Sequence, residues 1–157
     1  MAITFYQSTI HCFDYDPRMF LLLNAYFMGS EHRLIYQQKA VHEHDGQITI
    51  HNRRSLIDQT WPCIRLDSYM DQMKLLNIDL LIINTPELEY SVLRSLSTKI
   101  NNVKIICVKP CKNIFYDQKS FAENLNMCLR DYGFTLTNNL AFRTFDNLIF
   151  IKTTTFT

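Results

Sequence analysis

The sequence has 157 residues, of which 47% are hydrophobic and 13% aromatic, enough for one domain with a packed core. Its 16 basic and 15 acidic residues leave a formal net charge of +1, which excludes the strong positive field that gathers nucleic acid or an anionic membrane. No apolar run reaches the roughly 18 residues that cross a bilayer, and the first residues lack a signal-peptide pattern. We expect a single soluble, cytoplasmic domain over residues 1–157.

Cysteine and glycine content excludes several kinds of site. The five cysteines have no CxxC spacing, which indicates reduced thiols and neither a disulfide framework nor a zinc site. They are Cys12, Cys63, Cys107, Cys111 and Cys128. The only glycines, Gly29, Gly46 and Gly133, are far apart in the sequence, so the glycine-rich loops that bind phosphates or dinucleotides are absent.

The first half of the chain alternates strand and helix patterns. Residues 9–13 predict a strand and residues 18–28 a helix, with Pro17 in its first turn and Gly29 at its end. Residues 32–41 and 47–51 predict two strands, and the turn signal His44-Asp45-Gly46 between them favours a hairpin. A polar loop and then a short helix over residues 65–73 follow, with Asp67 or Ser68 near the helix cap.

The second half contains the strongest core signals. Residues 78–84 are apolar on both faces, which is typical of a central parallel strand. A helix should follow, with Pro86, Glu87 and Glu89 in its first turn and a buried stripe of Leu88, Val92, Leu93 and Leu96. Residues 103–110 predict a further strand and residues 121–132 a helix ended by Gly133. Two final strands should pair antiparallel, so we expect an α/β fold with a mostly parallel sheet.

Polar residues follow two of these strands, where ligands bind in open α/β sheets. Asp14 and Asp16 come after the first strand, and Asn84 after the central one. A carboxylate at a strand end can accept two hydrogen bonds from the hydroxyls of a nucleotide ribose. The alternative is that Asp14 or Asp16 caps the helix that begins at Pro17, and spacing alone does not separate the two.

Two other clusters have a simple structural explanation. His42-Glu43-His44 offers metal ligands, but adjacent residues rarely converge on one ion, so a solvated turn is favoured over a metal site. Trp61 before Pro62 could line a pocket, although a packing role is the more usual one. We therefore predict no metal site.

Several stretches resemble, in order, the FkbM family of S-adenosylmethionine (SAM)-dependent methyltransferases. They are CFDYDPRMFLLLNAY, KAVHEHDGQITIH, IRLDSYM, IDLLIINTPELEYSVLRSL, YGF and NLIFIK. The resemblance implies a Rossmann-like class I methyltransferase sheet with a C-terminal antiparallel hairpin. It also implies that Asp14 binds the SAM ribose, with Asp16 beside it, and that Ala40 and Val41 lie near the adenine.

The sequence also departs from the family pattern. The family begins with a strand and a glycine-rich cofactor loop, followed by a helix, and the strand, loop and helix are missing here. In the family's central motif, Asn84 replaces an aspartate, whereas Glu89 matches an acid. The resemblance makes Asn84 and Glu89 the candidates for catalysis.

Three functions are consistent with these residues. The first is an O-methyltransferase that acts on a small molecule or a saccharide. The second is an inactive methyltransferase-like domain that binds a partner chain, or a second copy, at the open edge of its sheet. The third is the C-terminal part of a longer active enzyme.

Overall fold

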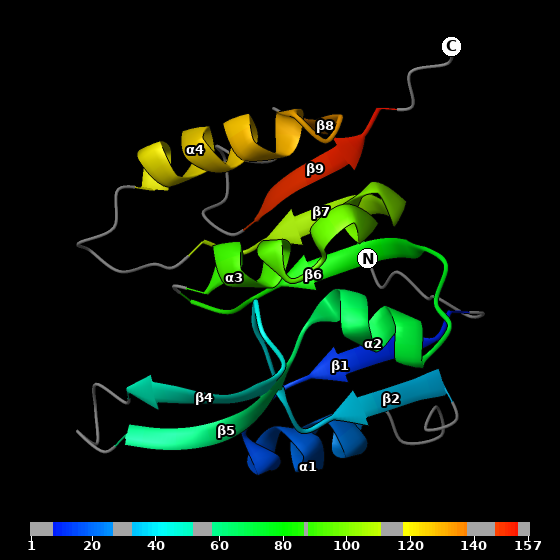
Figure 1. Cartoon of the computed structure of the whole chain (residues 1–157), viewed down its shortest axis with the longest axis vertical. Helices are drawn as coiled ribbons and strands as arrows, with labels where there is room; N and C mark the ends of the chain where they lie inside the picture. The colour runs from blue at the N-terminus through cyan, green and yellow to red at the C-terminus, as the bar shows by residue number, and fades with distance from the viewer. Residues whose placement is uncertain are drawn as a thin grey trace. The chain divides into compact units, whose positions relative to one another are not determined.

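The computed structural model describes residues 8–26, 33–51, 58–86, 88–110, 118–137 and 147–153. They contain both helices and strands, distributed along the whole chain (Figure 1), which confirms the predicted α/β class. The chain divides into two compact units, Met1–Arg65 and Leu66–Thr157, and each is described by itself. Within the ranges given above, no helix is long and apolar enough to cross a membrane.

The first unit begins with a parallel strand pair joined through a helix. β1 (Ile10–Phe13) pairs with β2 (Leu34–Gln37) in a register that sets Ile10 beside Leu34 and Phe13 beside Gln37. α1 (Pro17–Tyr26) follows β1 and has Pro17 as its first residue, where its fixed φ suits a helix start. The predicted strand and helix are confirmed, whereas the predicted helix end at Gly29 lies outside the described residues.

The second sheet of this unit corrects the predicted hairpin. β3 (Ala40–Val41), β4 (Gly46–His51) and β5 (Asp58–Ile64) form a sheet in the order β3-β5-β4. β4 pairs antiparallel with β5, and β3 pairs parallel with the end of β5. The single strand predicted over residues 32–41 is also wrong. A tight turn, in which Lys39 N donates to Gln37 O at 2.8 Å, separates β2 from β3.

The prediction missed β5 because its sequence, DQTWPCI, is polar at the start and contains a proline. Pro62 is tolerated because β3 pairs only with the last two residues of β5, Cys63 and Ile64. Along Pro62, therefore, one side of β5 has no partner strand among the residues described, and a missing N–H there breaks no ladder.

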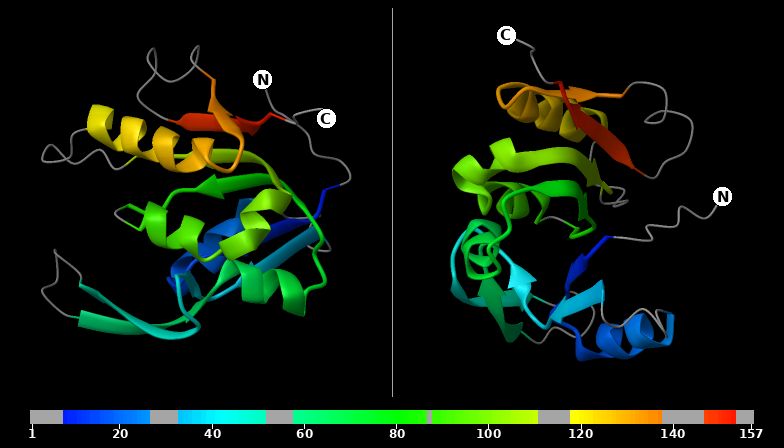
Figure 2. Two further views of the ribbon diagram at one scale, coloured as in Figure 1. Left: turned by 45° about the horizontal axis from the view of Figure 1, so that its top comes forward. Right: turned by 90° about the vertical axis from the view of Figure 1, so that its right-hand side faces the viewer.

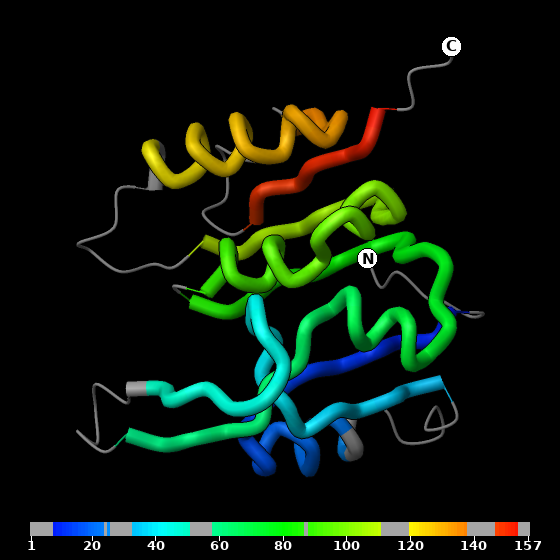
Figure 3. Tube along the Cα trace, viewed as in Figure 1, coloured from blue at the N-terminus to red at the C-terminus, as the bar shows by residue number. Residues whose placement is uncertain are grey.

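The second unit contains a four-stranded sheet in the order β6-β7-β9-β8. β6 (Ile78–Ile83) and β7 (Val103–Val108) are parallel. β9 (Leu148–Lys152) is antiparallel to both β7 and β8 (Phe134–Leu136), which confirms the closing antiparallel pair. Figure 3 follows the chain from β6 through the helical segment to β7.

The predicted central position of β6 is wrong. Over the described residues β6 pairs with β7 alone and so ends its sheet. Leu80 and Ile82, on the same face of the strand, are 38% and 65% exposed. An apolar run on both faces therefore predicted the strand correctly but not its neighbours, because a sequence does not show which strand lies on each side.

Three helical segments lie on one face of this sheet (Figures 1 and 2): α3 (Glu89–Arg94), the 3-10 helix η2 (Ser97–Asn102) and α4 (Gln118–Arg130). A further helix, α2 (Leu66–Gln72), is hydrogen-bonded at its first residue to Ser95, at the end of α3. The predicted stripe is confirmed at Val92, Leu93 and Leu96, which are at most 5% exposed, whereas Leu88 is only half-buried. The predicted first turn is confirmed for Glu89, the first residue of α3, and wrong for Pro86, which lies in a turn before the helix. Glu87 lies outside the described residues.

Candidate functional site

Asp14 lies at the carboxyl end of β1, beside the end of β2. Its backbone N–H donates to Gln37 O at 3.2 Å, which continues the parallel ladder by one bond. Its Oδ1 accepts a hydrogen bond from the Asp16 backbone N–H at 2.8 Å, the pattern of an Asx turn. The carboxylate is half-buried, and among the residues described its Oδ2 accepts no hydrogen bond. One oxygen of Asp14 therefore fixes the turn, and the other is available to a ligand.

Asp16 is the N-cap of α1. Its Oδ1 accepts a hydrogen bond from the Arg18 backbone N–H at 3.0 Å, which satisfies one of the unpaired N–H groups of the first helical turn. The Arg18 side chain adds an ion pair, with Nη2 at 2.5 Å from Oδ2. These hydrogen bonds, first from the side chain and then from the backbone of Arg18, lower the pKa of Asp16 to about 2. Its carboxylate already has several donors.

Three aromatic side chains surround this acidic turn. The Tyr36 hydroxyl of β2 donates to the Asp14 backbone oxygen at 2.9 Å, and its pKa is raised by burial and then by the charges of Asp14, Asp16 and Cys12. Tyr15 packs against Trp61 of β5, with ring centroids 5.4 Å apart. The Trp61 Nε1–H is buried and has no acceptor among the described residues. Because an unpaired buried N–H is costly, Trp61 offers a donor to a ligand with an acceptor atom.

Ala40 and Val41 form β3, three residues after the end of β2. Ala40 is 6% exposed, and the two residues pair with Cys63 and Ile64 of β5. Because Asp14 is bonded to Gln37, the structure brings the acidic turn and the start of β3 to the same end of the β1–β2 pair. This is where the sequence predicts ribose and adenine contacts.

The two catalytic candidates lie in the second unit, at the carboxyl end of β6. Asn84 directly follows β6 and is exposed. The Thr85 hydroxyl beside it is buried and has no partner among the residues placed here. Lys109 N donates to Ile83 O at 2.9 Å, so the ends of β6 and β7 are joined at this point.

Glu89 is the first residue of α3 and is only 1% exposed. A carboxylate in the first turn of a helix meets the positive end of the helix dipole. Its burial within the second unit sets it apart from Asn84, which faces solvent. The structure therefore presents one of the two predicted catalytic side chains at the surface and encloses the other.

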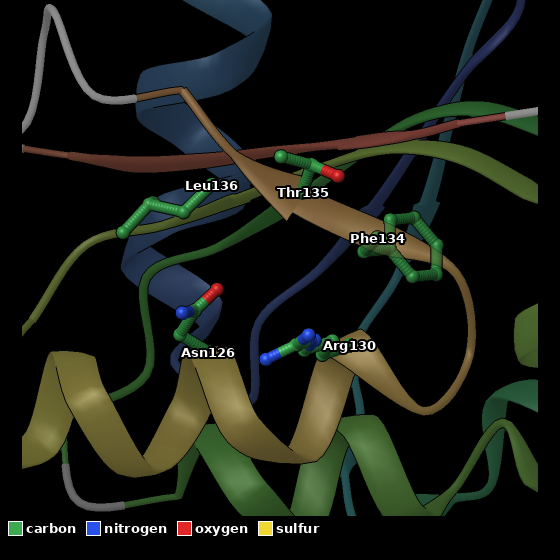
Figure 4. A pocket seen from close by; sticks show the side chains of 5 residues that line it. All are labelled: Asn126, Arg130, Phe134, Thr135 and Leu136. Carbon is green, nitrogen blue, oxygen red and sulfur yellow. The ribbon is translucent and has the colours of Figure 1, made fainter.

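A groove of about 270 Å³ lies elsewhere in the second unit, between α4 and β8 (Figure 4). Arg130 and Asn126 point from α4 toward the strand. Arg130 is in the last turn of α4, where a positive charge stabilises the helix. Because none of the predicted site residues lines this groove, it adds nothing to the candidate site. Its lining consists of Asn126, Arg130, Phe134, Thr135 and Leu136.

A family model for the methyltransferase FkbM domain matches residues 25–136, which is more than half of the chain. The chain belongs to the FkbM methyltransferase family. No curated protein and no solved structure matches the sequence. The FkbM match includes Ala40, Val41, Asn84 and Glu89, and it begins after Asp14 and Asp16.

The FkbM assignment leaves the acidic turn to be judged on its own geometry. That geometry separates two residues that sequence reasoning treated together, since Asp16 caps a helix and Asp14 keeps one oxygen available. Sequence reasoning missed Tyr36 altogether. Tyr36 lies one residue before the end of β2, and β2 neighbours the strand that ends in the acidic turn. That position is the signal that would have indicated Tyr36.

Proposed function

We propose that this FkbM domain binds SAM and transfers its methyl group to an oxygen of a small molecule or a saccharide. The family match supports methyl transfer as the reaction class. The observation that carries the cofactor proposal is the Asp14 carboxylate at the end of β1, with one oxygen in a backbone turn and the other without a partner among the described residues. A ribose diol supplies the donors that such an oxygen accepts.

The residues of the first unit fit the nucleoside half of SAM. Asp14 would hold the ribose hydroxyls, while Asp16 and Tyr36 would fix the turn that carries it. The small side chain of Ala40, in β3, would pack against the flat adenine ring. The Trp61 Nε1–H would donate to an acceptor atom of the nucleoside.

SAM, when bound, supplies a methyl group attached to a positively charged sulfur. An acceptor hydroxyl must be oriented toward that group, and it must release its proton, which passes to solvent water. We assign orientation to Asn84, because its exposed amide can hydrogen-bond an acceptor but cannot take up a proton. We assign Glu89 a positioning role, because its carboxylate is enclosed at the start of α3.

A non-catalytic methyltransferase-like domain is the second candidate function. The observation that favours it is the burial of Glu89, since the acid that matches the family motif does not face solvent. On this alternative the domain keeps the family fold and acts by binding a partner. Cofactor binding separates the two candidates, because only the first requires it.

The test is calorimetric titration of SAM into the purified chain and into Asp14→Asn. Asparagine keeps one oxygen for the Asp16 N–H and replaces the other by an NH2 group, which removes both the charge and the second acceptor. A hydrogen bond to a charged group contributes about 1.5–3 kcal/mol, so we expect the dissociation constant to rise about tenfold to a hundredfold. Asp79→Asn is the matched control, because it removes an exposed carboxylate of the second unit that is paired only with Lys104 in the contacts described here.

The outcomes are distinct. Binding by the wild type and by Asp79→Asn, with weaker binding by Asp14→Asn, supports the proposal. Equal binding by all three proteins would remove Asp14 from the ribose site. A folded wild type that does not bind SAM would overturn the cofactor proposal and favour the non-catalytic domain.

A further inference from the structure

The turn between β3 and β4 is held firmly in place. Backbone and side-chain groups from the end of β5 and from Arg65 bond to four successive residues of this turn. These bonds are His42 N to Ile64 O at 3.1 Å, Arg65 Nη1 to Glu43 O at 2.5 Å, Cys63 Sγ to His44 O at 3.3 Å and Arg65 N to Asp45 Oδ1 at 2.8 Å. Side chains on this turn therefore start from a fixed backbone.

Two imidazole rings meet on this turn. The Nδ1 atoms of His42 and His44 are 3.0 Å apart, and the ring centroids are 4.5 Å apart with the planes near perpendicular. His44 Nε2 lies 3.2 Å from Gln47 O, which can only accept, so Nε2 carries a proton. In a neutral His44, Nδ1 then carries a lone pair, and the Nδ1–H of His42 donates a hydrogen bond to it. Both Nδ1 atoms thus face one small region of space.

We propose that His42 and His44 chelate a divalent transition-metal ion, Cu²⁺ or Ni²⁺, through their Nδ1 atoms. Two nitrogen ligands that are 3.0 Å apart, each about 2.05 Å from a metal, subtend about 94° at it. This angle is close to the 90° of square-planar and tetragonal sites, which Cu²⁺ and Ni²⁺ prefer, and is smaller than the tetrahedral angle typical of Zn²⁺. Imidazole nitrogen is also a ligand type that suits both ions.

The hydrogen bond from His44 to Gln47 O is an independent observation in favour of a metal ligand. Histidines that bind metals almost always donate their other ring N–H to a carbonyl or carboxylate, which fixes the tautomer and the ring orientation. His44 already has that arrangement, with Nε2 on the carbonyl and Nδ1 toward His42. His42 reaches the same state when its proton moves from Nδ1 to Nε2, and the neutral pair loses no proton.

The pair of imidazole rings is open to solvent. His44 is exposed, so an ion reaches the pair from solvent. Within the described ranges no three His, Cys, Asp or Glu side chains form a metal-binding group, so water completes the proposed coordination. The site is therefore an open one with two protein ligands.

Electron paramagnetic resonance of the tag-free protein with one equivalent of Cu²⁺ tests the proposal directly. We expect an axial spectrum with hyperfine splitting from two imidazole nitrogens. His42→Gln and His44→Gln should each weaken Cu²⁺ binding at least tenfold in a calorimetric titration, because one ligand cannot chelate. His51→Gln is the matched control, since it removes a histidine from the other end of β4 and keeps both ligands.

Each result decides the matter. A two-nitrogen spectrum, with binding weakened by either ligand variant and unchanged by the control, supports the site. A wild-type spectrum with fewer than two imidazole nitrogens overturns it, and this result does not depend on whether a variant folds. Equal weakening by His51→Gln would place the ion elsewhere and also overturn the proposal.

Discussion

Replacing Ser95 by alanine should destabilise the second unit by about 1–3 kcal/mol. Ser95 is fully buried at the end of α3, and its hydroxyl serves a distant element. Its Oγ accepts a hydrogen bond from the Leu66 N–H at 3.2 Å and donates to Val92 O at 2.6 Å. The Leu66 N–H belongs to the first turn of α2, and the N–H groups of a first turn have no acceptor within the helix.

The magnitude follows from what the substitution leaves behind. In Ser95→Ala the Leu66 N–H stays buried without its acceptor, which costs about 1–3 kcal/mol, and loss of a helix cap typically costs about 1 kcal/mol. Both estimates describe the same N–H, so they are not added, and the expected cost stays at about 1–3 kcal/mol. The Ser95 backbone oxygen still accepts from the Asp67 N–H in the variant, and part of the cap therefore survives.

Urea unfolding followed by far-UV circular dichroism measures this change. Ser91→Ala is the control, because it makes the same chemical change on the same helix, at a hydroxyl without a hydrogen bond to any residue described. A domain of this size loses about 2–4 °C in Tm for each kcal/mol, so Ser95→Ala should also melt several degrees lower. If Ser95→Ala unfolds at the same urea concentration as Ser91→Ala, the cap contributes nothing and the reasoning is wrong.

Two further predictions concern the first unit. The pKa of Asp16 should be about 2 in an NMR titration, and Arg18→Ala should raise it toward 3.8, although not fully, because the backbone N–H of residue 18 still donates. Since the folded pKa is depressed, the stabilisation is complete above about pH 4 and disappears as the pH falls toward 2; an unchanged pKa in Arg18→Ala would contradict the assigned cause. Gly46→Ala should cost about 1–3 kcal/mol through backbone strain alone, because φ is +126° and nothing lies within 4 Å of the added methyl, and an equally stable variant in urea unfolding would contradict this.

The sequence predicted helices and strands well where a segment has a clear apolar pattern or a clear end signal. β6 and β7 are short apolar runs, and α4 ends at Arg130 in a turn that closes at Gly133, which has a positive φ. It failed at β5, whose pairing with β4 is decided by a partner and not by its own polar composition. It also placed α3 too early, because Pro86 suits both a helix start and a turn.

Long-range contacts explain the remaining failures. The cap of α2 comes from Ser95, 29 residues after Leu66, and a search near Asp67 and Ser68 could not find it. The approach of His42 to His44 depends on bonds from β5 and Arg65, which hold the turn between them. A sequence lists the ligands of such a site, but only the fold determines whether they converge.

The acidic turn shows how the structure divides two roles that spacing leaves open. Asp14 and Asp16 are two residues apart, and either could cap the helix that begins at Pro17. A cap must reach the N–H groups of the first turn, and Asp16 does so at the N–H of Arg18. Asp14 instead accepts a hydrogen bond from the backbone N–H of Asp16. The helix cap holds Asp16 in place, and Asp16 in turn orients the carboxylate of Asp14. The structural role of one acid thereby orients the other, and a ligand needs only the remaining oxygen of Asp14.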